Sequence, residues 1–271
     1  MSKLTRRDFA KIATVGLITA VHGPADGGLV RSLLGVRGAF SGGGAAPSGP
    51  SASDYVQSGL LSMWDGIENA GFGVPHDSGA TSWMDLARGT SEMSGISFNA
   101  NGAKVSGNGL VEFGSSGNNN YFIDILGADY TVECVLFVES VNSDITNTNG
   151  RIGPVLMNPG SSFTFGQPWN TPFYVWPYGF GNYAYNAGDF RGKSINLSAV
   201  YAASGTSRFY RDGADTGATA SSYPYQNKFY QPSIGGTFTG LYHSIRVYNR
   251  QLTAAEVAAN YAVDKARFGL S

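Results

Sequence analysis

The chain is poor in the residues on which many kinds of functional site depend. It holds one cysteine, three histidines and only 14% charged residues. The single cysteine, Cys134, excludes an intramolecular disulfide, and cysteine and histidine are too sparse for a zinc site at the usual spacings. The sequence also lacks a phosphate-binding loop, a dinucleotide-binding glycine motif and the G-x-S-x-G nucleophile motif. Motifs therefore predict no catalytic residue.

Charge and hydrophobicity exclude two classes of partner. After residue 40 the chain has 12 Lys and Arg against 17 Asp and Glu. This part has no basic stripe, so no nucleic-acid partner is expected. No apolar run is long enough to cross a bilayer, so no transmembrane span is expected.

What the chain does have is typical of a β protein. It contains 38 glycines, 15 tyrosines and 16 phenylalanines, a composition that suits short strands joined by tight turns. Residues 130–138 alternate as a strand, so Cys134 within them is expected to be buried and unreactive. A length of 271 residues is usual for one large sandwich domain.

The C-terminal end has the strongest local pattern. Residues 241–248 read as a buried strand, followed by a corner and a short helix. Thr253 and Glu256 have the spacing of a capping box, and Leu252 with Val257 have that of a hydrophobic staple. Val257, Tyr261 and Phe268 then recur on one helical face, which predicts that the helix packs back on the sheet.

Two further blocks join this ending in a family resemblance. Residues 59–87 run from an apolar strand through Trp-Asp and a glycine turn to a second Trp-containing segment. Residues 195–217 form a hairpin pattern in which Tyr210 and Arg211 precede the turn pair Asp212-Gly213. Together, the three blocks resemble the laminin-G-like, concanavalin A-like domains of bacterial or phage surface proteins. The resemblance implies an all-β fold over residues 54–271: a two-sheet antiparallel jelly-roll sandwich with a short C-terminal helix.

Two segments precede this domain. Residues 5–11, TRRDFAK, resemble a twin-arginine export signature with Ala10 where leucine is usual, and a short apolar run follows. Residues 1–40 are therefore expected to be an export leader, with an anchoring helix as the alternative. Residues 41–53 contain nothing but Gly, Ala, Ser and Pro, which predicts a flexible tether.

The densest aromatic segment lies at residues 163–190, with eleven aromatic residues in 28. Tyr174, Trp176, Tyr178 and Phe180 alternate, so a strand would place them on one face. That face is either core or a platform for sugar rings. The interleaved prolines and glycines indicate an irregular or edge strand rather than a central one. On the platform interpretation, the candidate ligand-binding residues are Trp169, Tyr174, Trp176 and Tyr178.

Acidic residues suggest two other sites. Glu133 and Glu139 share a strand face, but six strand residues span about 20 Å, whereas a glycosidase needs two carboxyl groups roughly 5–9.5 Å apart. Asp65, Asp77 and Asp85 surround a Trp-rich region, and laminin-G-like resemblance implies that such loop oxygens hold calcium. Ordinary turn chemistry is the alternative explanation for these three aspartates.

Three functions stay open on these observations. The resemblance implies a non-catalytic module that binds a glycan or cell-surface polysaccharide, or mediates adhesion, outside the cytoplasm. The leader would place it in the periplasm, at the cell surface or in the medium. The alternatives are a structural or receptor-contacting protein of a phage virion, and a glycoside hydrolase or polysaccharide lyase on the same fold. The sequence does not determine the oligomeric state.

Overall fold

The structure is a computed structural model, and it describes residues 49–105, 110–112, 129–141, 151–158, 161–166, 173–177, 185–188, 191–221, 230–235 and 238–271. For residues 91–93, 110–112, 141, 151–188, 220–221 and 230–238, the description within these ranges covers the backbone only. The predicted leader, residues 1–40, and most of the predicted tether lie outside the described residues. Residues 47–271 form one compact unit.

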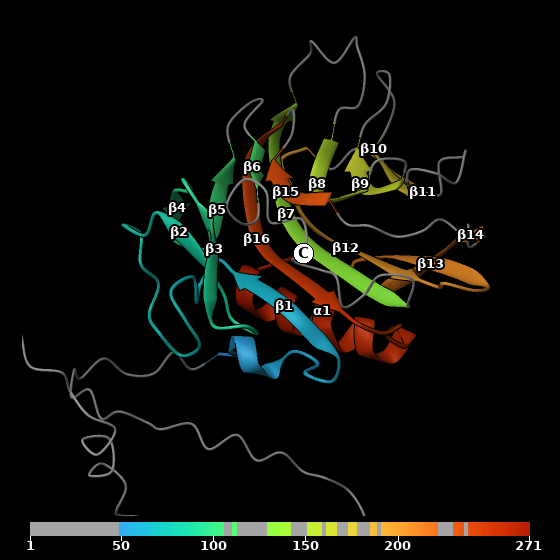
Figure 1. Cartoon of the computed structure of the whole chain (residues 1–271), viewed down its shortest axis with the longest axis horizontal. Helices are drawn as coiled ribbons and strands as arrows, with labels where there is room; N and C mark the ends of the chain where they lie inside the picture. Colours follow the sequence, from blue (N-terminus) through green and yellow to red (C-terminus); the bar gives the residue numbers. More distant parts are fainter. Residues whose placement is uncertain are drawn as a thin grey trace, which may run out of the picture. The chain divides into compact units, whose positions relative to one another are not determined.

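Two antiparallel sheets make up most of this unit (Figure 1). The larger, eight-stranded sheet contains, in spatial order, β14 (Ala214–Ser221), β13 (Thr206–Arg211), β12 (Ser194–Tyr201), β7 (Tyr130–Val141), β16 (Phe238–Tyr248), β5 (Gly102–Val105) and β4 (Phe98–Asn99), with β1 (Leu60–Asp65) also paired to β16. The smaller, six-stranded sheet has the order β11 (Tyr185–Gly188), β10 (Phe173–Pro177), β9 (Ser161–Gly166), β8 (Arg151–Asn158), β15 (Tyr230–Gly235) and β6 (Leu110–Glu112). A separate hairpin joins β2 (Ser82–Asp85) and β3 (Thr90–Ser94). The predicted two-sheet antiparallel sandwich closed by a C-terminal helix is confirmed.

Side chains alternate along the three central strands, β12, β7 and β16, and so divide the eight-stranded sheet into two faces. The inner face is apolar and carries the largest core cluster, which includes Cys134, Leu136, Leu197, Ile245 and Val247. Cys134 is fully buried, as predicted, and burial raises the pKa of its thiol well above the usual value. The outer face of the same three strands instead carries buried polar side chains: Glu133, Asn196, Ser198, Ser244 and Arg246.

Helix α1 (Ala254–Phe268) covers this outer face. Thr253 and Glu256 form the predicted capping box, and Leu252 packs in one cluster with Val257. The helix ends at Gly269, whose φ of 68° is the left-handed conformation that glycine favours at this position. The predictions for the helix start, the staple and the packed face are therefore confirmed.

The predicted hairpin turn lies between β13 and β14. Asp212 has φ 50° and Gly213 has φ 75°, so both central residues are left-handed, as a two-residue hairpin of this type requires. The turn also lies close to α1, because a Cβ on Gly213 would approach the Tyr261 Cβ to 2.8 Å. Glycine is therefore needed both for conformation and for space.

The domain begins earlier than residue 54. Residues Ala52–Asp54 form a 3-10 helix with its own capping box at Ser51, and Ala52 is fully buried. Ala52 and Tyr55 pack with Met63 and Leu86. The prediction that the tether extends to residue 53 is corrected, because burial of one alanine and a set of polar contacts fix residues 51–53.

Candidate functional site

The described residues of the aromatic segment, 163–166, 173–177 and 185–188, lie in strands β9, β10 and β11 of the six-stranded sheet. β10 pairs on one side with β9 and on the other with β11, so it is not an edge strand, and this part of the prediction is wrong. The predicted irregularity is present, because the β10–β11 register shifts between Phe173 and Tyr174. Tyr174 and Trp176 lie in β10 at positions that share one face. Trp169 and Tyr178 lie outside the described residues.

The strand register assigns neighbours to Tyr174 and Trp176. Tyr174 is directly opposite Gly166 of β9 and Asn186 of β11, and Trp176 is opposite Thr164. Directly opposed residues of antiparallel strands share a face. We call this set the ring face; it comprises Arg151, Met157, Ser162, Thr164, Gly166, Tyr174, Trp176 and Asn186 of strands β8 to β11.

The reverse face of the same four strands has a different composition. The register places there Ile152, Leu156, Asn158, Ser161, Phe163, Phe165, Phe173, Val175, Pro177, Tyr185 and Gly188. Eight of these eleven residues are apolar or aromatic, and the two polar ones, Asn158 and Ser161, form the last pair of the β8–β9 ladder. The ring face instead combines two aromatic residues and a methionine with a cation, an amide, two hydroxyl residues and a glycine. The four strands are therefore amphipathic, a distinction that the sequence pattern of β10 alone did not reveal.

The three aspartates proposed as calcium ligands are used in turns and ion pairs. Asp65 is buried and its Oδ1 accepts bonds from the amides of Ile67 and Glu68, at 2.9 Å each, and from Arg267 at 2.7 Å. The Oδ1 of Asp85 accepts from the backbone amides of three residues, Met63, Ala87 and Arg88. Asp77 is exposed and its Oδ1 accepts from Gly79.

These contacts do not suit a metal ion. Within the described part of the chain, no group of three or more Asp, Glu, His or Cys side chains is close enough to hold one. The carboxylate of Asp65 already faces the guanidinium of Arg267, whose positive charge opposes a second cation. Calcium stays a prediction that the observed contacts do not support.

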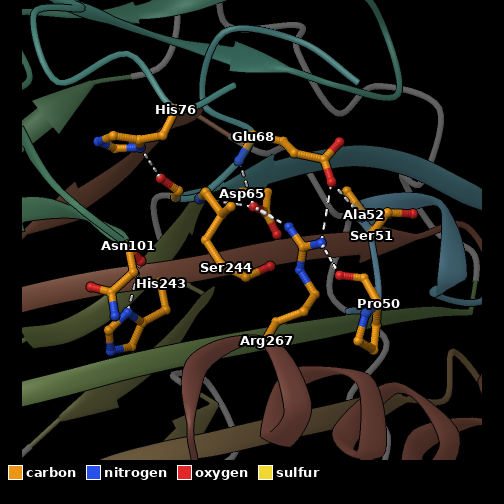
Figure 2. Close-up of polar contacts among 12 residues, drawn as sticks. Pro50, Ser51, Ala52, Asp65, Glu68, His76, Asn101, His243, Ser244 and Arg267 are labelled. Carbon is orange, nitrogen blue, oxygen red and sulfur yellow. Dashed lines mark hydrogen bonds and ion pairs between the residues drawn. The ribbon is translucent and has the colours of Figure 1, made fainter. Parts of the chain in front are cut away.

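Figure 2 shows how Arg267 joins three parts of the chain. Its Nη2 donates to Asp65 at 2.7 Å, and its Nη1 donates to Glu68 at 3.1 Å and to the carbonyl of Pro50 at 2.8 Å. The side chain of Arg267 is 3% exposed. Burial raises the pKa of Asp65, although the nearby Arg267 partly offsets the rise.

A second buried network lies between α1 and the sheet. Arg246 donates to Glu133 at 2.9 Å and to both oxygens of Asp264 at 2.7 Å each. Asn260 and Asn196 donate to the same two carboxylates. Burial raises the pKa of Glu133, and Arg246 partly offsets this effect. The sequence prediction missed this network because Asn260 and Asp264 look like solvent-facing helix residues, although they share the spacing of Val257 and Phe268.

The positions of these carboxylates argue against hydrolysis by them. Glu133 is fully buried in an ion pair, while Glu139 of the same strand is exposed. Asp65 and Asp264 are likewise buried and paired with arginines. A polysaccharide cannot reach buried, charge-paired carboxylates, so none of them suits the acid or base of a glycosidase.

The histidines outside the leader have structural contacts. His243 is stacked on Phe268, and its ring nitrogens contact the Asn101 carbonyl at 2.9 Å and the Ser194 hydroxyl at 3.2 Å. Burial lowers the pKa of His243. His76 contacts the Gly66 carbonyl at 2.8 Å through Nδ1 (Figure 2). No helix in the described residues is both long and apolar enough to span a membrane.

Comparison with known proteins identifies the fold but no family. No protein-family model matches the chain, and no curated protein matches it by sequence. The sialidase of Trypanosoma rangeli, solved with sialic acid, matches with a TM-score of 0.56 and 15% identity over 76% of this chain and 33% of the sialidase. The chain thus spans about a third of that protein.

A second solved structure is matched over nearly its whole length. It is domain 4 of AbnA, an extracellular GH43 arabinanase of Geobacillus stearothermophilus, in complex with arabinotriose. It matches with a TM-score of 0.50 and 14% identity over 74% of this chain and 98% of that domain. At such low identities the likeness shows a shared β-sheet fold and does not transfer an activity.

Proposed function

We propose that the domain is a non-catalytic glycan-binding module that acts outside the cytoplasm, and that the ring face is its binding surface. The observation that carries the proposal is the difference between the two faces of strands β8 to β11. A sandwich buries the more apolar face of each sheet against the other sheet. This rule assigns the more apolar reverse face to the core and leaves Tyr174 and Trp176 on the outside.

The composition of the ring face suits a sugar chain. An aromatic ring offers a flat apolar surface for the C–H face of a sugar, while neighbouring polar groups bond its hydroxyls. Arg151, Thr164 and Asn186 occupy the positions around Tyr174 and Trp176. Gly166, directly opposite Tyr174, adds no side chain beside that residue. The likeness to a domain solved with arabinotriose supports a sugar ligand by analogy of fold.

Substitutions on the two faces of β10 give opposite results under this proposal. Trp176→Ala and Tyr174→Ala are each expected to lower glycan affinity by about 2 kcal/mol, roughly thirtyfold, with little change in melting temperature. Val175→Ala, between them on the reverse face, should lower stability and leave the affinity of the folded protein unchanged. Trp169→Ala tests the remaining tryptophan of the segment in the same way.

The ligand is first found by a glycan array probed with the full chain, with and without calcium, and the affinity is then measured by calorimetry. A large fall in melting temperature in both Trp176→Ala and Tyr174→Ala would indicate that these residues are part of the core. It would refute the assignment of the two faces. Glycan binding that requires added calcium would support the predicted calcium site. Equal affinity with calcium and with a chelator would argue against that site.

The proposal that the protein is exported depends on the leader, residues 1–40, and it is tested separately. The match of residues 5–11 to a twin-arginine signature supports secretion of a folded domain. Arg6→Lys combined with Arg7→Lys should keep the protein in the cytoplasm, as measured by fractionation and immunoblotting. Exported protein that still begins at Met1 would favour the anchoring alternative.

A further inference from the structure

Residues 50–56, where the chain enters the domain, are fixed by side chains rather than by strand pairing. We call them the entering segment. The amide of Ala52 donates to the Glu68 carboxylate at 2.7 Å, and the Pro50 carbonyl accepts from Arg267 at 2.8 Å. Ala52 is 0% and Tyr55 is 2% exposed, so these two side chains belong to the domain interior although the segment directly follows the tether.

Three side chains of α1 hold the segment in order along the helix. Asn260 accepts from the Val56 amide at 2.8 Å, Asp264 accepts from the Tyr55 hydroxyl at 2.7 Å, and Arg267 donates to Pro50. The three are spaced at i, i+4 and i+7, which places them on one stripe of a helix. The entering segment therefore runs antiparallel to α1.

The same helix side chains also fasten α1 to the sheet. Asp264 forms the ion pair with Arg246 of β16, and Asn260 donates to Glu133 of β7. The guanidinium of Arg246 lies 4.0 Å from the centre of the Tyr55 ring. Removing any one of these groups leaves another buried polar group unpaired, so the contacts reinforce one another.

We infer that the entering segment is a polar clip that attaches the tether to the α1 side of the sandwich, opposite the ring face. α1 covers the outer face of the eight-stranded sheet, whose inner face carries the core cluster. The six-stranded sheet is the other layer of the sandwich, and the ring face is assigned to its outer side. A domain attached in this way presents its binding surface away from its point of attachment.

This inference rests on the proposed function only for the role of the ring face; the clip stands on its own contacts. A pull on the tether would load the charge-assisted hydrogen bonds of Pro50, Ala52 and Tyr55, and those of Ala52 and Tyr55 are buried. Such bonds are stronger than neutral ones, and they are difficult to break while water is excluded. The clip therefore resists peeling of the chain away from the domain.

Hydrogen exchange of the full chain tests the clip. The amides of Ala52 and Val56 should exchange slowly in the native protein, since both are bonded to buried side chains. Arg267→Met keeps the bulk of the side chain but removes the bonds to Pro50, Glu68 and Asp65. Exchange at Ala52 should therefore accelerate at least tenfold while β7 amides stay protected. Arg208→Met, which breaks an exposed pair with Asp215, is the matched control and should change neither.

Distance measurements between paired spin labels test the placement. Labels at Ser53→Cys and Thr164→Cys should lie across the whole sandwich, roughly 20 Å or more apart given two layer spacings of about 10 Å each. Labels at Ser53→Cys and Ala259→Cys of α1 should be closer together. Cys134 is buried, so it does not compete for the label.

The outcomes separate the two proposals. Fast exchange at Ala52 and Val56 in the native protein, or no effect of Arg267→Met, overturns the clip whatever the domain binds. A Ser53–Thr164 distance no longer than the Ser53–Ala259 distance overturns the opposite placement. Slow exchange together with loss of stability in both Trp176→Ala and Tyr174→Ala keeps the clip and refutes the glycan surface instead.

Discussion

The buried charge of Arg246 gives the sharpest test of how the helix is held. One guanidinium serves two carboxylates, Glu133 and Asp264, and all three side chains are 0% exposed. Arg246→Met keeps most of the volume and the apolar stem, but it leaves both carboxylates buried without their cation. Removing one partner of such a buried pair costs about 3–5 kcal/mol. We expect a loss in this range, measured by urea unfolding at neutral pH.

Acid should reduce this loss. Burial already raises the pKa of Glu133, while Arg246 lowers it, so removing Arg246 raises that pKa further. A carboxyl whose pKa is higher in the folded than in the unfolded state binds more protons when folded, and stability then rises as the pH falls through the raised pKa. The difference in unfolding free energy between Arg246→Met and the native protein should therefore shrink on acidification.

Neutralising the carboxylates should also restore stability. Adding Glu133→Gln and Asp264→Asn to Arg246→Met removes the unpaired charges, so the triple variant should be more stable than the single one at neutral pH. Arg208→Met, at an exposed ion pair, should change stability by about 1 kcal/mol or less. The reasoning is refuted if Arg246→Met costs no more than this control, or if its effect does not depend on pH.

Three further predictions concern the ends and the interior of the domain. Thr253→Ala removes the capping oxygen of α1 and should cost about 1 kcal/mol in thermal or urea unfolding, whereas Thr253→Ser should cost a few tenths at most; equal losses would contradict the cap. Arg250 lowers the pKa of Glu256 to about 2 from its usual 4.5. The native protein should therefore melt at a higher temperature than Arg250→Gln above pH 4.5, and this difference should shrink as the pH falls toward 2. A difference that is unchanged at pH 2 would exclude this ion pair as its source. Cys134 should react with iodoacetamide only in denaturant, because it is buried and its thiol pKa is raised; rapid labelling of the native protein, followed by mass spectrometry, would contradict its burial.

Local patterns in the sequence were sufficient for the parts of the fold that depend on neighbours in the chain. The capping box at Thr253, the staple of Leu252 and Val257, and the Asp212-Gly213 turn involve residues at most five positions apart, so their spacing can be read directly. Period-two alternation likewise identified residues 130–138 as a strand and Cys134 as a core residue. These predictions did not depend on which elements pack against one another in the folded domain.

Pairing between strands determined where the aromatic strand β10 lies in the sheet and which residues share its two faces. Proline and glycine near Trp176 favoured an edge strand, but β9 and β11 pair on both sides of β10. The composition of a face depends on which residues of other strands lie opposite, as Gly166 and Asn186 lie opposite Tyr174. A single strand contains no information about that register, so the ring face could be recognised only from the sheet.

Only the tertiary structure determined which partners the buried charged residues have. Asp65 was predicted as a metal ligand, but it meets Arg267, which is 202 positions away in the chain. Asp264 and Asn260 have the helical spacing of core residues but are polar, and only the placement of Arg246 beneath them makes their burial favourable. Sequence therefore determined the C-terminal helix with its cap, the Asp212-Gly213 turn and the strand at residues 130–138. Long-range pairing of buried charges determined how the helix and the entering segment close the domain.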